Sequence, residues 1–341
     1  MPLATDISED WLRRLPKPEL HLHLEGTVTP ETWRRILARR APRTVPPLAD
    51  LQARYRFQDI AGFFDVFLSV VRSLQGPEDY RLIAREAGLA LSRHGVVYAE
   101  LHTSIAGAQW AGRLNGDEML CAMEEGLAEA EAEGGPAWRL IVDVCRDFCA
   151  QGSGDIALGL ATRHRGRGVA ALGMGGSEDE PAGVAAGVFA AARAAGLRVT
   201  AHAGEQAGPD SIWGVLEAGA ERLGHAARAP EDPALVRYLS ERRVPLEMCP
   251  ASNVRTGAVS TLEAHPVGGF LRAGLNVSLN TDDPPFFGTD PVTEYRRVAD
   301  AFGLCREEVL RLARNGFEAA FLPEPAKAAL LARLDHFVAE G

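Results

Sequence analysis

The chain has 341 residues, of which 46% are hydrophobic and 24% are charged, as in ordinary soluble globular proteins. This length can bury a large core, and a single closed barrel of strands and helices commonly has about 250 residues or more. The 36 basic and 46 acidic side chains leave a net charge of −10, which speaks against nucleic acid or an anionic membrane as the main partner.

The cysteines and the apolar segments predict where the chain works. The five cysteines are odd in number and form no Cys-x-x-Cys pair, which is typical of reduced thiols in a reducing compartment. No stretch of 18 or more apolar residues is present, and the N-terminal segment MPLATDISEDWLRRLPK lacks the apolar core of a signal peptide. We therefore expect a cytoplasmic protein that does not enter the membrane.

Short apolar runs alternate with segments of helical periodicity, such as Ala182–Ala195 and Ala234–Arg242. The apolar runs are Glu19–Leu24, Val96–Thr103, Trp138–Val144, Val169–Met174, Leu197–Ala201, Arg222–His225, Val244–Met248 and Leu275–Asn280. Strand–helix alternation favours a parallel sheet, and eight such units predict a (β/α)8 TIM barrel that forms a single domain over residues 1–341. An open doubly wound sheet is the alternative, but no Gly-x-Gly-x-x-Gly follows an early strand.

A long segment separates the first two predicted strands. Between His23 and Val96, apolar residues with helical spacing run from Ile60 to Leu74. This pattern indicates either a helix that faces the core or an apolar lid over the mouth of the barrel, because the loop after the first strand lies at the catalytic end. We expect a helical lid insertion after strand 1.

The segment His21-Leu22-His23 has the spacing of a metal site within a strand. Alternate residues of a strand point to the same side, so both imidazoles can bind one ion while Leu22 points away. Neutral imidazole suits zinc and similar metals. The alternative is a pair of polar side chains inside the barrel that neighbouring groups satisfy.

Further residues of catalytic type follow later strands. His202 and Glu205 follow the fifth predicted strand, and His225 ends the sixth. Asp282 and Asp283 come directly after the eighth. Catalytic groups of barrel enzymes come from the C-terminal ends of different strands, so we expect these side chains to meet. Each also has an ordinary alternative, since Glu205 can cap a helix, His225 can be a buried satisfied histidine, and either aspartate can be an N-cap.

The other histidines differ in what we expect of them. His102 ends the second predicted strand and can reach the same pocket. We expect His94, His164, His265 and His336 at the surface, because histidine is commonly exposed or partly exposed.

Six segments, taken together, resemble the adenosine deaminase family of the amidohydrolase superfamily. They are PKPELHLHLEGTVTPET (16–32), LGMGGSE (172–178), HAGE (202–205), RLGHA (222–226), EMCPASNVRTGAV (247–259) and SLNTDDPPFF (278–287). The resemblance implies a barrel that hydrolytically deaminates a 6-aminopurine to the 6-oxo purine and ammonia. The substrate would be a small free molecule, since no Pro-Cys-x-x-Cys follows a His-x-Glu, which is the paired motif of nucleic-acid-editing zinc deaminases.

The resemblance also implies one zinc ion per chain as the cofactor. Its ligands would be His21, His23, His202 and Asp282. Three nitrogens and one carboxylate form a set that zinc accepts, with an open position for water. Other members of the superfamily bridge two metals with a carboxylated lysine, but neither Lys17 nor Lys327 lies at a predicted strand end. We therefore expect one metal.

Roles for further residues follow from the resemblance. Glu205 would donate a proton to the purine ring, because an apolar pocket can raise the pKa of a carboxyl group. His225 would orient the attacking water and stabilise its charge, and zinc would make that water more acidic. Asp283 would bond the five-membered ring, and the Gly176 N–H would reach the other edge of the purine. The residues expected to contact the substrate are His23, Glu25, Phe64, Gly176 and Asp283.

The group on N9 of the purine stays open. Family members that act on adenosine typically carry Asp where this chain has Glu25, whereas members that act on free adenine often carry Glu. The segments RTGAV (255–259) and DDPPFFGTD (282–290) are more similar to nucleoside-type members. We expect an adenosine-type nucleoside. The alternatives are aminodeoxyfutalosine, a menaquinone precursor whose deaminases have a similar Gly-rich loop and FGTD turn, and free adenine. Another metal-dependent hydrolase and a binding protein with a structural metal are further alternatives.

Overall fold

A computed structural model describes residues 7–340, and it confirms the TIM barrel. The ends of the predicted domain, residues 1–6 and 341, lie outside the described residues. Within residues 7–340 eight parallel strands follow one another around the barrel in chain order. They are β1 (Lys17–His23), β2 (Val96–Thr103), β3 (Ala137–Cys145), β4 (Val169–Gly175), β5 (Arg198–Ala203), β6 (Arg222–His225), β7 (Leu246–Met248) and β8 (Val277–Leu279).

The barrel closes just beyond the end of β8, where the chain pairs with β1. Leu22 and Asp282 form a parallel bridge. The His23 N–H donates to the Asp282 carbonyl at 3.0 Å, and the Asp282 N–H donates to the His21 carbonyl at 3.0 Å. The closure therefore places Asp282 beside both histidines of β1.

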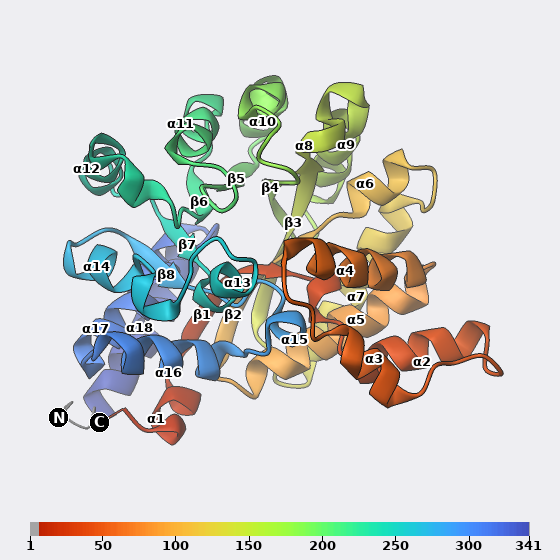
Figure 1. The fold of residues 1–341 in the computed structure, drawn as a ribbon, viewed down its shortest axis with the longest axis horizontal. Coiled ribbons are helices and arrows are strands. Elements are labelled where there is room, and N and C mark those ends of the chain that lie inside the picture. Colours follow the sequence, from red (N-terminus) through yellow and green to blue (C-terminus); the bar gives the residue numbers. More distant parts are fainter. Residues whose placement is uncertain (1–6, 341) are drawn as a thin grey trace.

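Helices connect the strands and surround them (Figure 1). Between β2 and β8 they are α6 (Ile105–Trp110), α7 (Gly116–Ala132), α8 (Arg146–Phe148), α9 (Gly154–His164), α10 (Ala186–Ala194), α11 (Pro209–Ala218), α12 (Pro233–Glu241), α13 (Pro250–Arg255) and α14 (Val267–Arg272). The chain begins with α1 (Glu9–Arg14) and ends with α15 (Pro284–Phe287), α16 (Pro291–Phe302), α17 (Arg306–Ala319) and α18 (Glu324–Glu340). No helix within residues 7–340 has the length and apolarity needed to cross a bilayer.

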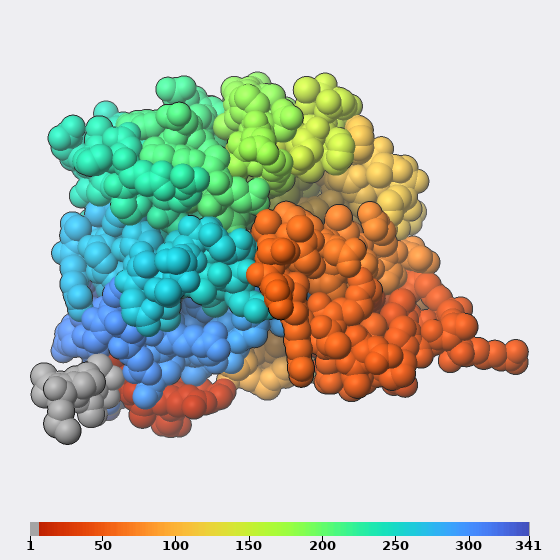
Figure 2. Space-filling model, viewed as in Figure 1, coloured from red at the N-terminus to blue at the C-terminus, as the bar shows by residue number. Residues whose placement is uncertain are grey.

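The segment between β1 and β2 is helical, as predicted. It holds α2 (Pro30–Arg40), α3 (Leu48–Arg54), α4 (Ile60–Ser73) and α5 (Pro77–Ser92). The buried face of α4 carries Phe63, whose ring stacks on Phe287 with centroids 5.1 Å apart. The helix therefore packs on the segment that follows β8. Figure 2 shows this insertion, in orange, against the cyan segment around α13.

Alternate strand residues point into the barrel, and in β1 the inward residues are polar. In β1 these are Glu19, His21 and His23, while Leu20 and Leu22 belong to the main hydrophobic core. Deeper in the barrel, Arg222 of β6 pairs with Glu100 of β2 at 2.5 Å and with Glu247 of β7. All three side chains are fully buried. This ion-pair network fixes Glu247, which in turn contacts His21.

Replacing Arg222 with Met should destabilise the fold strongly. The change removes the cation and leaves two carboxylates buried without it, which costs about 3–5 kcal/mol. Urea unfolding would measure the loss. The matched control is Arg13→Met, which breaks an exposed pair with Glu9 on α1 and should cost less than about 1 kcal/mol. Equal, small losses for both variants would contradict the role given to Arg222.

Candidate active site

The predicted metal-type side chains converge at the C-terminal ends of the strands. Nε2 of His202 lies 3.0 Å from Nε2 of His21 and 3.0 Å from Nε2 of His23. Asp282 Oδ1 lies 3.2 Å from Nε2 of His23 and 3.6 Å from Nε2 of His21. Four ligands held tetrahedrally at zinc–nitrogen distances would stand about 3.4 Å apart. These four distances, from 3.0 to 3.6 Å, are therefore close to those between ligands of one zinc ion.

The partners of Nδ1 in His21 and His202 show whether Nε2 of the same ring carries a proton or a lone pair. Nδ1 of His202 lies 2.8 Å from the Met174 carbonyl, which can only accept a hydrogen bond. Nδ1 of His21 lies 2.9 Å from the Glu247 carboxylate. Burial, together with the neighbouring imidazoles, lowers the pKa of both histidines well below the ordinary value. Both rings therefore present a lone pair to the cluster, and a bound cation would stabilise this arrangement.

Asp282 supplies the negative charge of the cluster. Its Oδ2 accepts a 2.6 Å hydrogen bond from the Ser252 hydroxyl. Burial opposes ionisation, but the hydrogen bond from His23 and the charge of that ring hold the pKa of Asp282 below its ordinary value. Its φ of 63° is left-handed, a conformation that side-chain-bearing residues adopt at a cost of about 1–3 kcal/mol and keep mainly at functional sites. The donor set fits a divalent metal ion.

Glu205 and His225 stand next to this cluster. Glu205 Oε2 lies 3.7 Å from Nε2 of His225, and Glu205 Oε1 accepts a 3.2 Å bond from the Thr256 hydroxyl. Burial raises the pKa of Glu205, so the carboxyl group holds a proton more readily than an exposed glutamate. His225 is 1% exposed and has a left-handed φ of 65°. The structure therefore brings together the two residues predicted to be catalytic.

The backbone that carries Glu205 is held by a residue to which the sequence assigned no role. The buried Glu178 carboxylate accepts N–H bonds from Gly204 at 2.8 Å, Glu205 at 2.9 Å and Gln206 at 2.9 Å. Three convergent donors satisfy one carboxylate and fix the turn after β5. The signal in the sequence was the position of Glu178 at the end of the LGMGGSE segment, but no spacing rule linked it to residues 204–206.

Asp283 and Gly176, the two residues expected to bond the purine, both have closely packed surroundings. Burial and the charge of Asp282 raise the pKa of Asp283 well above its ordinary value, and its Oδ1 has no partner within residues 7–340. A Cβ at Gly26 would overlap this carboxyl group, so the close approach requires glycine. Gly176 has a φ of 98°, and a Cβ there would overlap the Asp147 carboxylate.

Two further buried polar side chains are Glu25 and His102. Glu25 Oε1 accepts bonds from the Thr103 hydroxyl at 2.9 Å and the Ser104 N–H at 3.2 Å. His102 Nδ1 lies 2.8 Å from the Asp143 carboxylate. In the described part of the chain, Glu25 Oε2 and His102 Nε2 are buried without a hydrogen-bond partner. Buried polar atoms without a partner are rare unless a ligand satisfies them, so Glu25 and His102 are candidates for substrate contact.

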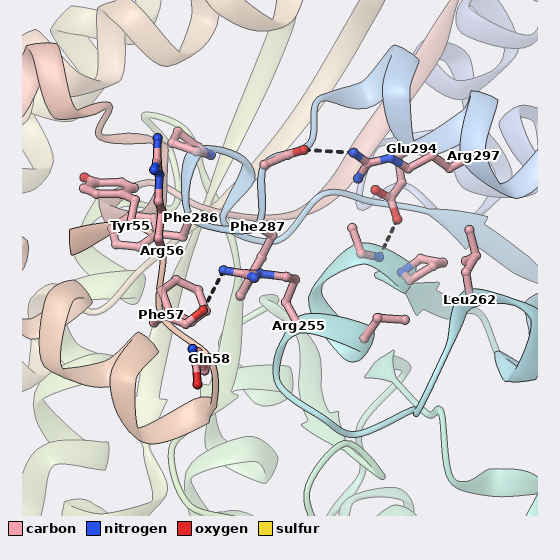
Figure 3. Close-up of a pocket in the computed structure, with 15 residues that line it drawn as sticks. Tyr55, Arg56, Phe57, Gln58, Arg255, Leu262, Phe286, Phe287, Glu294 and Arg297 are labelled. Carbon is pink, nitrogen blue, oxygen red and sulfur yellow. Dashed lines mark hydrogen bonds between the residues drawn. The ribbon is translucent and has the colours of Figure 1, made fainter. Parts of the chain in front are cut away.

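The expected aromatic contact Phe64 is placed differently from its neighbours. Phe57 and Phe63 are buried against Phe287, whereas Phe64 is 40% exposed on α4. Beyond these rings lies a cavity of about 550 Å³ between α13, α15 and α16 (Figure 3). Arg255 crosses it and donates to the Phe57 carbonyl at 3.0 Å. None of the predicted catalytic or metal-binding residues lines this cavity.

The prediction that His164 and His265 lie at the surface is wrong. His164 is 4% exposed, because its ring lies between Glu124 at 2.7 Å and Asp117 at 3.2 Å. His265 is 2% exposed, with Nε2 lying 3.1 Å from Asn253 Oδ1. Specific polar partners allow both rings to be buried. His336 is exposed, as expected.

Comparison with known proteins decides the family. The family model described as Adenosine deaminase matches residues 16–337. The chain belongs to the adenosine deaminase family. The resemblance of the six sequence segments is thereby confirmed. As a member of this family the protein is an aminohydrolase, an enzyme that removes an amino group from a purine.

Individual relatives span the whole fold. The chain is 39% identical to an aminodeoxyfutalosine deaminase of Streptomyces coelicolor over 332 residues, which cover 95% of this chain and 85% of that one. It is 36% identical to an adenosine deaminase of Klebsiella pneumoniae, over 94% of this chain and 98% of that one. The crystal structure of an adenine deaminase from Arthrobacter aurescens matches with a TM-score of 0.88 and 30% identity, over 95% of this chain and 99% of that one.

Glu178→Gln should slow deamination without unfolding the protein. The amide would turn an N–H group toward one of the three backbone donors and shift Glu205, and a misplacement of about 1 Å can cost about 10²-fold in kcat. Steady-state kinetics and thermal melting would measure both effects. Glu180→Gln is the control, because Glu180 is exposed two residues away. An unchanged kcat in Glu178→Gln would contradict the role of this clamp.

Proposed function

We propose that this enzyme removes the 6-amino group of aminodeoxyfutalosine by hydrolysis, leaving the 6-oxo purine and ammonia. The observation that carries the chemistry is the convergence of His21, His23, His202 and Asp282 beside Glu205. The identity of the substrate is supported by the 39% identity to aminodeoxyfutalosine deaminases of two Streptomyces species, against 36% for adenosine deaminases and for an adenine deaminase. This substrate replaces the adenosine-type nucleoside that the sequence suggested first.

We propose zinc as the metal, with one ion per chain. The ligands would be Nε2 of His21, His23 and His202 and Oδ1 of Asp282, whose mutual distances were given above. When bound, zinc makes a coordinated water acidic enough to act as a nucleophile near neutral pH. Glu247 and the Met174 carbonyl hold the rings of His21 and His202 in the required orientation.

The remaining residues bind the purine and move protons. Glu205 gives its proton to the ring nitrogen as water adds to the carbon that bears the amine. Of the two protons of that water, one returns Glu205 to its protonated form and the other converts the departing amino group to ammonia as the carbon–nitrogen bond breaks. His225 hydrogen-bonds the attacking oxygen. Asp283, whose pKa is raised by burial and by the charge of Asp282, donates to a nitrogen of the five-membered ring. The Gly176 N–H bonds the opposite edge of the base. His23, Glu25 and Phe64 border the substrate, with Glu25 Oε2 offering a buried acceptor to a hydroxyl group.

Glu205→Gln should abolish deamination while the protein keeps its metal. The amide cannot give up a proton, and general acid catalysis contributes about 10²–10⁴-fold. The loss of adenine-type absorbance and the release of ammonia would report turnover, and elemental analysis would report the metal. A chelator should abolish activity of the wild type, and added zinc should restore it. Wild-type turnover in Glu205→Gln would show that another group donates the proton.

A substrate panel tests which group N9 carries. We expect kcat/KM for aminodeoxyfutalosine to exceed that for adenosine, deoxyadenosine, methylthioadenosine and adenine by about tenfold or more, because kcat/KM measures discrimination between substrates. Free adenine is the second candidate, since Glu25 is the residue type often found in adenine-acting members and the adenine deaminase structure matches closely. Higher kcat/KM for adenine or adenosine would overturn the assignment of aminodeoxyfutalosine.

A further inference from the structure

A line of hydrogen bonds leads from a backbone N–H to His225. The Val267 N–H donates to Nδ1 of His265 at 3.2 Å. Nε2 of His265 lies 3.1 Å from Asn253 Oδ1, and Asn253 Nδ2 lies 3.0 Å from Nδ1 of His225. The three side chains are 2%, 0% and 1% exposed, respectively, so the line is shielded from water.

The direction of every bond in this line follows from its first member. A backbone N–H can only donate, so Nδ1 of His265 carries a lone pair and its proton is on Nε2. That proton requires an oxygen on the facing side of Asn253, which turns the amide NH2 toward His225. Nδ1 of His225 must then accept. The line therefore leaves one arrangement, in which Nδ1 of His225 carries a lone pair and the ring proton is on Nε2.

The surroundings of His265 agree with this direction. Burial, with His225 nearby, lowers the pKa of His265 to about 3, so the ring is neutral near pH 7. Pro266, which follows His265, leads directly into α14, where Val267 is the first residue and its N–H has no partner within the helix. The N–H at the start of α14 thus orients His265, which reaches His225 through Asn253.

We propose that Asn253 and His265 are positioning residues that hold His225 as the Nε2–H tautomer. This deepens the proposed function of the same site. His225 lies near His21, His202 and Asp282, close enough to be counted among the possible metal ligands. With a proton on Nε2 it has no lone pair for the ion. It acts as a hydrogen-bond donor to the attacking oxygen, and it neither binds the metal nor takes a proton from water.

The ¹⁵N spectrum of histidine tests the proposal directly. In protein labelled at its nine histidines, two-bond ¹H–¹⁵N correlations distinguish a protonated ring nitrogen from one with a lone pair, and His225→Gln identifies the signals. We expect Nε2 of His225 to be protonated and Nδ1 not, both as purified and after chelation. A proton on Nδ1 in the wild type would overturn the proposal.

Asn253→Asp should reverse the proton position. A carboxylate can only accept, so Nδ1 of His225 gains a proton, and kcat falls about 10–100-fold, the size of effect seen when a partner of a site residue is lost. Asn315→Asp is the control, because Asn315 is also buried but bonds the Val277 carbonyl outside the site. The control should leave the His225 signals and kcat unchanged. Unaltered His225 signals in Asn253→Asp would contradict the proposal.

A second pair of variants keeps the test independent of the folding of Asn253→Asp. His265→Gln can still accept from Val267 and donate to Asn253, so the tautomer should persist. His265→Leu cannot, and His225 should then show a mixture of tautomers; a single Nε2–H form in His265→Leu would refute the relay. These signals do not depend on any substrate. If the predicted tautomer is found but no purine in the panel is deaminated, the proposed function fails and the relay stands.

Discussion

The structure depends on an arrangement that is unfavourable without a positive charge. Neutral imidazoles of His21 and His202 point lone pairs at each other across 3.0 Å, and the Asp282 carboxylate adds negative charge at the same point. Repulsion among these atoms would separate them if the rings were free to turn. The rings are not free, because Nδ1–H of His21 donates to the Glu247 carboxylate and Nδ1–H of His202 donates to the Met174 carbonyl. The fold thus holds a cation site in place before any ion enters.

Two buried carboxylates and one side-chain amide orient the residues of the site, and each of them has hydrogen-bond or ion-pair partners of its own. Glu247 is paired with Arg222 deep in the barrel, and Glu178 accepts three backbone N–H groups next to Glu205. Asn253 links His225 to the start of α14. A buried polar group is costly when unpaired, so a complete set of partners makes each orientation the only favourable one. The strained backbone at Asp282 and His225 is kept by this framework.

The positions of the strands were predictable from the sequence because apolar runs and alternation are local patterns. The bounds of β2 and β6 coincide with the apolar runs Val96–Thr103 and Arg222–His225. The strands β7 and β8 are shorter than their runs, since Pro245 cannot donate to a strand ladder and the Val277 N–H bonds Leu275 within its own segment. The inward alternation of His21 and His23 also followed from the strand alone.

The residue types at the strand ends, and the segments shared with the deaminase family, predicted the family and its aminohydrolase chemistry, and they predicted metal-type side chains that the structure brings together. Tertiary structure decided the proton positions and the supporting partners. The clamp of Glu178 on residues 204–206 and the link from Val267 to His225 join segments that meet only when the barrel closes. The burial of His164 and His265 had the same origin, because a histidine is buried when distant side chains supply its hydrogen bonds, and no local pattern records those partners.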